Sequence, residues 1–262
     1  MPNRPVWDQI KNVLPDMDSA EAEIFIESLR DELIPDIDWL LARAEDRDEL
    51  KTVLECLGYL APPQGMPLLF RHLNDWDEKV QLCAAGALKH YPPEDLLEPL
   101  VHMFLSQKAP AARIGDVLAP LGREAGSALM KAYPKSAPDL KIQILSFLIQ
   151  ILDPRCEALA YLALEDPEPE VKKTGLKAVE VMRFRSLWGN VARLLKHEFW
   201  ILRGRAIQVL TDMRVTEARH LVRPLTLDPD PWVRECAGLY LCALFPDSEN
   251  TWDTKEDAAN DS

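Results

Sequence analysis

Residues 227–245, LDPDPWVRECAGLYLCALF, bring together the residue types that a reactive site uses. Asp228 and Asp230 could supply carboxylates, Arg234 a permanent positive charge and Cys236 a thiol nucleophile. A thiol is a good nucleophile only where its surroundings lower its pKa, and a carboxylate acts as a general base only within hydrogen-bond reach of its substrate. Whether this stretch is a site therefore depends on the elements that position it.

The remaining candidate ligands and motifs give little support for catalysis. A zinc site needs three or four converging ligands, and the chain contains no CxxC pair. It also lacks GxGxxG, GxxxxGK[ST] and GxSxG motifs. We therefore expect a protein that is not an enzyme and has no catalytic residue, cofactor or metal. The five cysteines, expected to be reduced and mostly buried, are Cys56, Cys83, Cys156, Cys236 and Cys242.

Composition favours a helical protein of the cytoplasm. The chain has 262 residues, 47% of them hydrophobic, and its 21 prolines against 10 glycines suit short helix–turn–helix units. No apolar run approaches the ~18 residues that a membrane span requires. The start, MPNRPVWDQIKNVLPD, has no apolar segment typical of a signal peptide. These features predict a cytoplasmic protein without a membrane partner.

The stretch that begins at Leu227 has relatives earlier in the chain. EDPEPEVKKTGLKAVEVM, at residues 165–182, has the same acid-Pro-acid-Pro entry and the same Val-basic start. NDWDEKVQLCAAGALKHY, at residues 74–91, keeps the acids, the valine and the small residues. Aligning the chain on this valine gives seven anchors spaced 30 or 31 residues apart: Leu50, Val80, Pro110, Leu140, Val171, Leu202 and Val233.

Each repeat contains two apolar runs with helical periodicity. In residues 171–196, VKKTGLKAVEVM and SLWGNVARLLK both place apolar or small residues at i, i+3, i+4 and i+7 spacing. The short linkers allow only antiparallel helix pairs, and no convincing strand pattern occurs. One such pair cannot bury its own apolar faces. The sequence therefore predicts an all-α superhelix, a solenoid of stacked antiparallel helix pairs.

The pattern D-P-x-P-x-V-R/K followed by a helix of small residues resembles the HEAT-like repeats of the short, phycobilisome-lyase-related type. The resemblance covers residues 46–245 and is clearest at Val80-Gln81, Val171-Lys172 and Val233-Arg234. It implies a fold and not a reaction. It also implies an inter-repeat ladder, in which the acid of one repeat binds the arginine of an adjacent repeat. Here the ladder would link Asp166, Asp228 and Arg234.

The repeat gives residues 227–245 a structural interpretation. Pro229 and Pro231 keep the chain extended and end the preceding helix, and Asp228 or Asp230 caps the next one. Cys236 shares its repeat offset with Cys83, Thr174 and Gln143, which favours packing over nucleophilic chemistry.

The two ends do not follow the repeat, and we expect three regions. Residues 1–45 form an acidic helical cap, in which a helix over 18–34 begins at Asp18 or Ser19 and places four apolar residues along one side: Ile24, Phe25, Leu29 and Leu33. A short helix follows Pro35. Residues 46–245 form six helix pairs and a terminal half-repeat, and residues 246–262 form an acidic, disordered tail with Trp252 as its only apolar anchor.

Charge is distributed unevenly along the chain. Residues 1–49 hold 14 Asp/Glu against 5 Lys/Arg, whereas residues 171–223 hold 12 Lys/Arg against 4 Asp/Glu, within a net charge of −13. In solenoids of this type the second helices usually line the concave face. A set of cationic and polar side chains falls at a matching offset on these helices, and we predict that it binds a partner: Arg71, His102, Lys131, Tyr161, Arg193, Lys196, Arg219 and Arg223.

Three functions fit the sequence to different degrees. The best fit is a non-enzymatic scaffold or adaptor whose concave face binds another protein through an acidic segment. Nucleic acid or another polyanion is an alternative ligand for the basic band 171–223, although acidic ends and few aromatic residues make nucleic acid unlikely.

The third possibility is a HEAT-repeat enzyme such as a phycobilin lyase. Deoxyhypusine hydroxylases, which are built of similar repeats, hold two irons with several His-Glu pairs. This chain has a single such pair, His197-Glu198.

Overall fold

The computed structural model describes residues 4–246 and contains only helices and turns over that range, with no strand. The all-α fold expected from the sequence is therefore confirmed. The chain divides into two compact units, Met1–Leu129 (unit 1) and Met130–Ser262 (unit 2). Among the described residues, no helix is both long and apolar enough to cross a bilayer.

Unit 1 contains short helices joined by tight turns. Its helices are α1 (Arg4–Val13), α2 (Ser19–Ser28), α3 (Arg30–Leu33), α4 (Ile37–Arg43), α5 (Leu50–Leu60), α6 (Met66–His72), α7 (Glu78–Leu88), α8 (Pro93–Leu105) and α9 (Ala111–Leu118). Helix α10 (Gly122–Ala132) spans the division between the units.

In unit 2, long first helices alternate with short second helices. Its helices are α11 (Pro138–Gln150), α12 (Glu157–Leu164), α13 (Pro169–Met182), α14 (Trp188–Arg193), α15 (Trp200–Asp212), α16 (Arg219–Val222) and α17 (Pro231–Leu244). Two of the short helices continue into 3-10 turns, α14 into Leu194–Lys196 and α16 into Arg223–Leu227.

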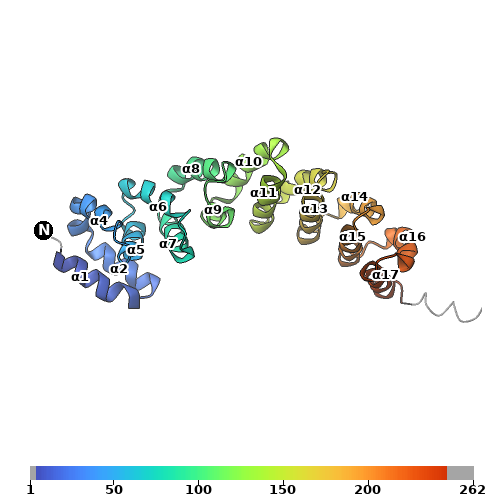
Figure 1. Cartoon of the computed structure of the whole chain (residues 1–262), viewed down its shortest axis with the longest axis horizontal. Helices are drawn as coiled ribbons and strands as arrows, with labels where there is room; N and C mark the ends of the chain where they lie inside the picture. Colours follow the sequence, from blue (N-terminus) through green and yellow to red (C-terminus); the bar gives the residue numbers. More distant parts are fainter. Residues whose placement is uncertain (1–3, 247–262) are drawn as a thin grey trace, which may run out of the picture. The chain divides into compact units, whose positions relative to one another are not determined.

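Within each unit, first helices pack against first helices. In unit 1, α5 contacts α7 and α7 contacts α9; in unit 2, α11, α13, α15 and α17 contact one another in succession. Within each unit, second helices pack beside the first helix of the next pair, as α6 does on α7 and α12 does on α13 (Figure 1). From α5 onward, the described part of the chain therefore forms six helix pairs followed by the single helix α17.

The seven anchors mark the beginnings of the first helices. Five of them are buried, as their place on the inward face requires: Leu50, Val80, Val171, Leu202 and Val233. Pro110 is exposed at the N-cap of α9, and Leu140 is half-buried in α11. The repeat register is thus maintained even where the anchor residue itself is not part of the core.

Aspartates before the first helices form a repeated capping arrangement. Before α7, the Asp75 carboxylate accepts the backbone amide of Asp77 at 2.9 Å, and Asp77 caps the helix by accepting the amide of Lys79 at 2.9 Å. Before α17, Asp228 accepts the amide of Asp230 at 2.9 Å, and Asp230 caps the helix. These bonds satisfy amides that the first helical turn leaves unpaired.

Two glycines permit close approach between neighbouring first helices. A Cβ at Gly58 of α5 would lie 2.8 Å from the Cα of Ala87 in α7. At Gly204 of α15, a Cβ would lie 1.9 Å from the ring of Trp232 in α17. A side chain at Gly58 would press on the backbone of α7, and one at Gly204 would displace the Trp232 ring.

The N-terminal region differs from the expected single long helix. Residues 18–34 form α2 and α3, interrupted at Leu29, with Asp18 and Glu21 forming a capping box. The expected apolar side is wrong at Ile24, which is 73% exposed, because Ala22 and Ile26 face inward instead. Helices α2 and α4 both contact α5, in the manner of a preceding helix pair.

The two predicted region boundaries, at residues 45 and 245, stay predictions. The single helix α17 matches the expected terminal half-repeat in extent. Most of the acidic tail, residues 247–262 with Trp252, lies outside the described residues.

Candidate functional site

The stretch at residues 227–245 is a structural junction. Asp228 is buried and binds Arg203 of the preceding first helix, while Asp230 caps α17. Cys236 is only 4% exposed, and burial raises the pKa of its thiol, so the thiolate is disfavoured. The interpretation as helix capping and packing is confirmed.

The inter-repeat ladder forms with partners other than those expected. The Asp166 carboxylate accepts Lys141 Nζ at 2.7 Å, and the Asp228 carboxylate accepts Arg203 Nη2 at 2.7 Å. The expected role of Arg234 is wrong: its Nη1 donates to the backbone carbonyls of Asp228 and Pro229, at 2.7 and 2.9 Å. Arg234 lies in the last described helix, so no later repeat presents an acid to it within the described residues.

Burial and ion pairing together set the ionisation of the ladder acids. The Asp75, Asp166 and Asp228 side chains are at most 6% exposed. The Arg47 guanidinium lowers the pKa of Asp75, and the Arg203 guanidinium lowers that of Asp228, with burial opposing in both cases. For Asp166, burial opposes ionisation most, but Lys141 and a backbone amide lower the pKa overall.

Candidate metal ligands do not converge in the described part of the chain. No group of three or more His, Cys, Asp or Glu residues is arranged there to hold a metal ion. His197 of the single His-Glu pair accepts the backbone amide of Phe199 at 3.2 Å and stacks on its ring. The contacts of His197 with Phe199 therefore lie within one turn of the chain.

All eight side chains predicted to bind a partner are exposed and lie on second helices or the turns that continue them. Unit 1 carries Arg71 on α6 and His102 on α8, and the other six lie within unit 2. The structure therefore divides the predicted set between the units. Its role in binding a partner stays a prediction.

Within unit 2, four cations form two close pairs that we call the cationic row: Arg193, Lys196, Arg219 and Arg223. The first pair is three residues apart and the second four, so each pair projects from one side of its helix and turn. Earlier in the sequence, α12 carries two exposed side chains, Tyr161 at 44% and Leu162 at 42%. Helix α12 contacts α14, which carries Arg193.

Three of the four cations differ in their contacts with neighbouring side chains. Arg193 Nη1 donates to Glu165 at 2.9 Å, but both side chains are largely exposed, so the pair contributes little stability. The Arg219 guanidinium lies 4.4 Å from the ring centroid of Phe245. Lys196 forms no ion pair with any described residue. The cationic row thus keeps positive charge at the surface.

An exposed aromatic cluster was missed from the sequence. Trp200 and Ile201, at the start of α15, are 44% and 40% exposed, and Trp200 meets Trp232 edge-on at 5.5 Å. With Arg205 they line a depression of about 460 Å³. The consecutive letters FWI at residues 199–201 were the only signal, because a helical pattern alone does not show which face stays uncovered.

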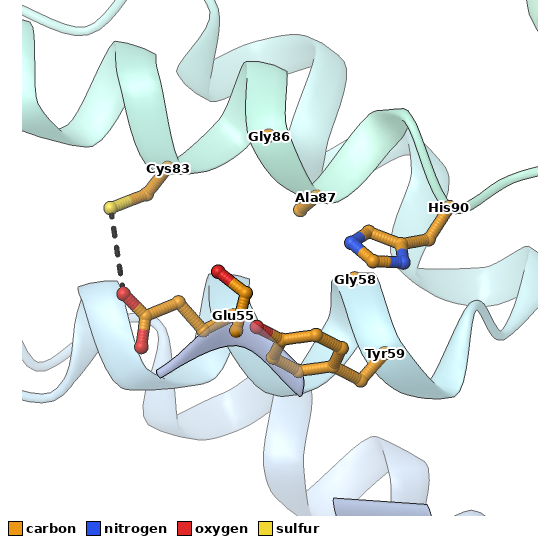
Figure 2. Close-up of a pocket in the computed structure, with 8 residues that line it drawn as sticks. Glu55, Gly58, Tyr59, Cys83, Gly86, Ala87 and His90 are labelled. Carbon is orange, nitrogen blue, oxygen red and sulfur yellow. Dashed lines mark hydrogen bonds between the residues drawn. The ribbon is translucent and has the colours of Figure 1, made fainter. Parts of the chain in front are cut away.

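A second feature missed from the sequence is a pocket of about 230 Å³ in unit 1 (Figure 2). Helix α5 contributes Glu55, Gly58 and Tyr59, and α7 with the turn after it contributes Cys83, Gly86, Ala87 and His90; Ser19 of α2 completes the lining. The Cys83 thiol donates to Glu55 Oε1 at 3.9 Å, and burial raises the pKa of both groups. A protonated thiol of this kind is not an activated nucleophile.

Comparisons with known proteins agree with the repeat architecture. Residues 35–119 match HEAT repeats, a segment that runs from the turn before α4 to the end of α9. A search of the curated proteins returned no match.

Two solved structures of engineered proteins are similar at 15% identity. One has a TM-score of 0.42 over 90% of this chain and 77% of its own, and the other 0.33 over 91% and 96%. Residues 35–119 are thus similar to HEAT repeats, and the helix pairs of the described chain keep the same register beyond that segment.

Proposed function

We propose that the protein is a non-enzymatic interaction module, and that the second-helix surface of unit 2 binds an acidic segment of a partner protein. HEAT repeats generally serve as protein-interaction scaffolds, because stacked pairs offer extended surface to a partner. The observation that carries the proposal is the cationic row together with the exposed Tyr161 and Leu162 on α12, a helix that contacts α14.

The row favours a carboxylate-rich ligand with an apolar anchor. Arginine and tyrosine are enriched where partner proteins contribute most binding energy, and exposed cations raise the rate at which an acidic ligand associates. An acidic segment would place carboxylates on the cations and one apolar side chain on Tyr161 and Leu162.

Protein is a better match than nucleic acid for this surface. The chain carries a net charge of −13, which repels a polyphosphate at long range. Single-stranded nucleic acid also uses aromatic side chains for base stacking, and Tyr161 is the one aromatic side chain that we assign to this surface.

Photo-crosslinking at Tyr161 tests the proposal directly. We expect p-benzoylphenylalanine at position 161 to crosslink a partner segment that mass spectrometry identifies as rich in Asp and Glu with an apolar residue. Val181, on the first helix α13, is the matched control because it is also 44% exposed. Crosslinks to nucleic acid, to a basic segment, or equally from position 181 would contradict the proposal.

A further inference from the structure

The pocket between α5 and α7 contains a carboxylate without a cationic partner. Glu55 is half-buried, and its one hydrogen bond within the described residues is the long contact from the Cys83 thiol. Lys51, whose charge lowers the pKa of Glu55, has its Nζ 3.6 Å from Asp77 and forms its ion pair there. A desolvated carboxylate with only a thiol donor leaves most of its hydrogen-bonding capacity unused.

The electrostatic surroundings favour a positive ligand. The charges that act on Tyr59 and Cys83 include the carboxylates of Glu23, Glu55 and Asp77, and the ammonium of Lys51. A cation entering the pocket would therefore meet net attraction, and an anion net repulsion.

Two aromatic rings, from Tyr59 and His90, form part of the lining. Tyr59 and His90 meet edge-on with their centroids 5.0 Å apart, and Figure 2 shows both rings on the opposite side of the pocket from the Glu55 carboxylate, which points toward Cys83. The face of a tyrosine ring attracts ammonium and guanidinium groups, and both rings offer apolar contact to a methylene chain.

The small residues on α5 and α7 keep the pocket open. Gly86 lines the pocket, and a Cβ at this residue would meet no atom within 4 Å. The volume of about 230 Å³ is below the roughly 300–1,000 Å³ typical of sites for drug-sized ligands. It suits the end of one long side chain better than a cofactor.

We propose that this pocket binds the cationic side chain of a lysine or arginine from a partner protein. The ammonium or guanidinium group lies on the Glu55 carboxylate, and the aliphatic stem lies against Tyr59 and His90. The site is separate from the cationic row and selects the opposite charge.

Titration of the full chain with n-butylammonium, n-butylguanidinium and neutral n-butanol, followed by NMR, tests this assignment. We expect saturable shifts of the Gly58 and Gly86 backbone amides with both cations, and about tenfold weaker binding of the alcohol. The cation that binds with the higher affinity indicates whether the pocket suits lysine or arginine. Equal binding of the alcohol and the cations would overturn the proposal.

Two variants separate binding from folding. Glu55→Gln removes the charge and should weaken cation binding about tenfold, whereas Glu94→Gln, at an exposed position on α8, should leave it unchanged. Gly86→Leu fills the pocket from a position with free space, and should abolish the shifts with the helical circular dichroism retained. Undiminished cation binding in Glu55→Gln or in a folded Gly86→Leu chain would contradict the assignment.

Discussion

Arg203 holds Asp228 through two parallel hydrogen bonds, from Nε to Oδ2 at 2.8 Å and from Nη2 to Oδ1 at 2.7 Å. The remaining nitrogen of the guanidinium, Nη1, donates to the carbonyls of His197 and Glu198, each at 2.9 Å. One side chain thus ties the start of its own helix to the start of the next repeat. The two side chains are 13% and 4% exposed, so neither charge is well hydrated.

We predict that Arg203→Met destabilises unit 2 by about 3 kcal/mol, because it leaves the buried Asp228 without its cation. Urea denaturation measures the loss. Arg185→Met is the matched control, since Arg185 pairs with Glu217 at 3.3 Å and both side chains are at least 50% exposed. The control should cost less than about 1 kcal/mol. Equal losses of stability in the two variants would show that burial of the Arg203–Asp228 pair does not increase its contribution to stability.

The glycines of the last two first helices should respond oppositely to alanine. Gly204→Ala places a methyl group into the ring of Trp232 and should cost about 1–3 kcal/mol. Gly238→Ala, in α17, meets no atom within 4 Å and should stabilise the helix by about 0.5–1 kcal/mol. Thermal or urea unfolding distinguishes the two, and a stabilising Gly204→Ala would refute the packing described between α15 and α17.

Stability should fall in acid because of the ladder acids. The pKa of Asp75, Asp166 and Asp228 is lower in the folded chain than in the unfolded one. Ionisation therefore favours folding: the contribution is complete above the unfolded-state pKa, near 4, and is lost as the pH falls through the lower folded-state pKa.

The measurement is the free energy of unfolding as a function of pH for the wild type and for Asp228→Asn. The variant should be less stable at neutral pH and lose less stability between about pH 5 and pH 3. Asp212→Asn, at an exposed position, should follow the wild-type curve. Parallel curves for the wild type and Asp228→Asn would rule out Asp228 as a source of the acid sensitivity.

The two cysteines of residues 227–245 should differ in reactivity. Cys242 is exposed, whereas Cys236 is buried and its pKa is raised by burial. Iodoacetamide should therefore modify Cys242 well before Cys236, as read by tandem mass spectrometry of the tryptic peptide 235–255. Modification of Cys236 at the same rate would revive a reactive role for this stretch.

Much of the fold could be predicted because the repeat register depends on local pattern. The anchors Val171, Leu202 and Val233 recur at nearly constant spacing and are buried in the structure. Capping by Asp230 follows from its position directly before Pro231 at a helix start. These features can be predicted from neighbouring residues and the helical period alone.

What could not be predicted depends on how separate helices meet. Asp228 pairs with Arg203, 25 residues earlier, and not with the nearby Arg234, because stacking sets which side chains face each other. The inward side of α2 was misassigned at Ile24 for the same reason. The pocket at Glu55 needs side chains from three helices, and no spacing along the chain signals it.

Binding of a short fluorescent peptide, rich in Glu and Asp with one central leucine, tests the central claim most directly. At about 50 mM salt, where screening is modest, fluorescence anisotropy should show binding that weakens as salt rises. The variant Lys196→Gln/Arg219→Gln/Arg223→Gln should lose affinity about tenfold. The control Lys173→Gln/Lys177→Gln/Arg214→Gln changes the net charge equally at other exposed positions and should bind like the wild type. Equal affinities of the two variants, or tighter binding of duplex DNA than of the peptide, would contradict the account.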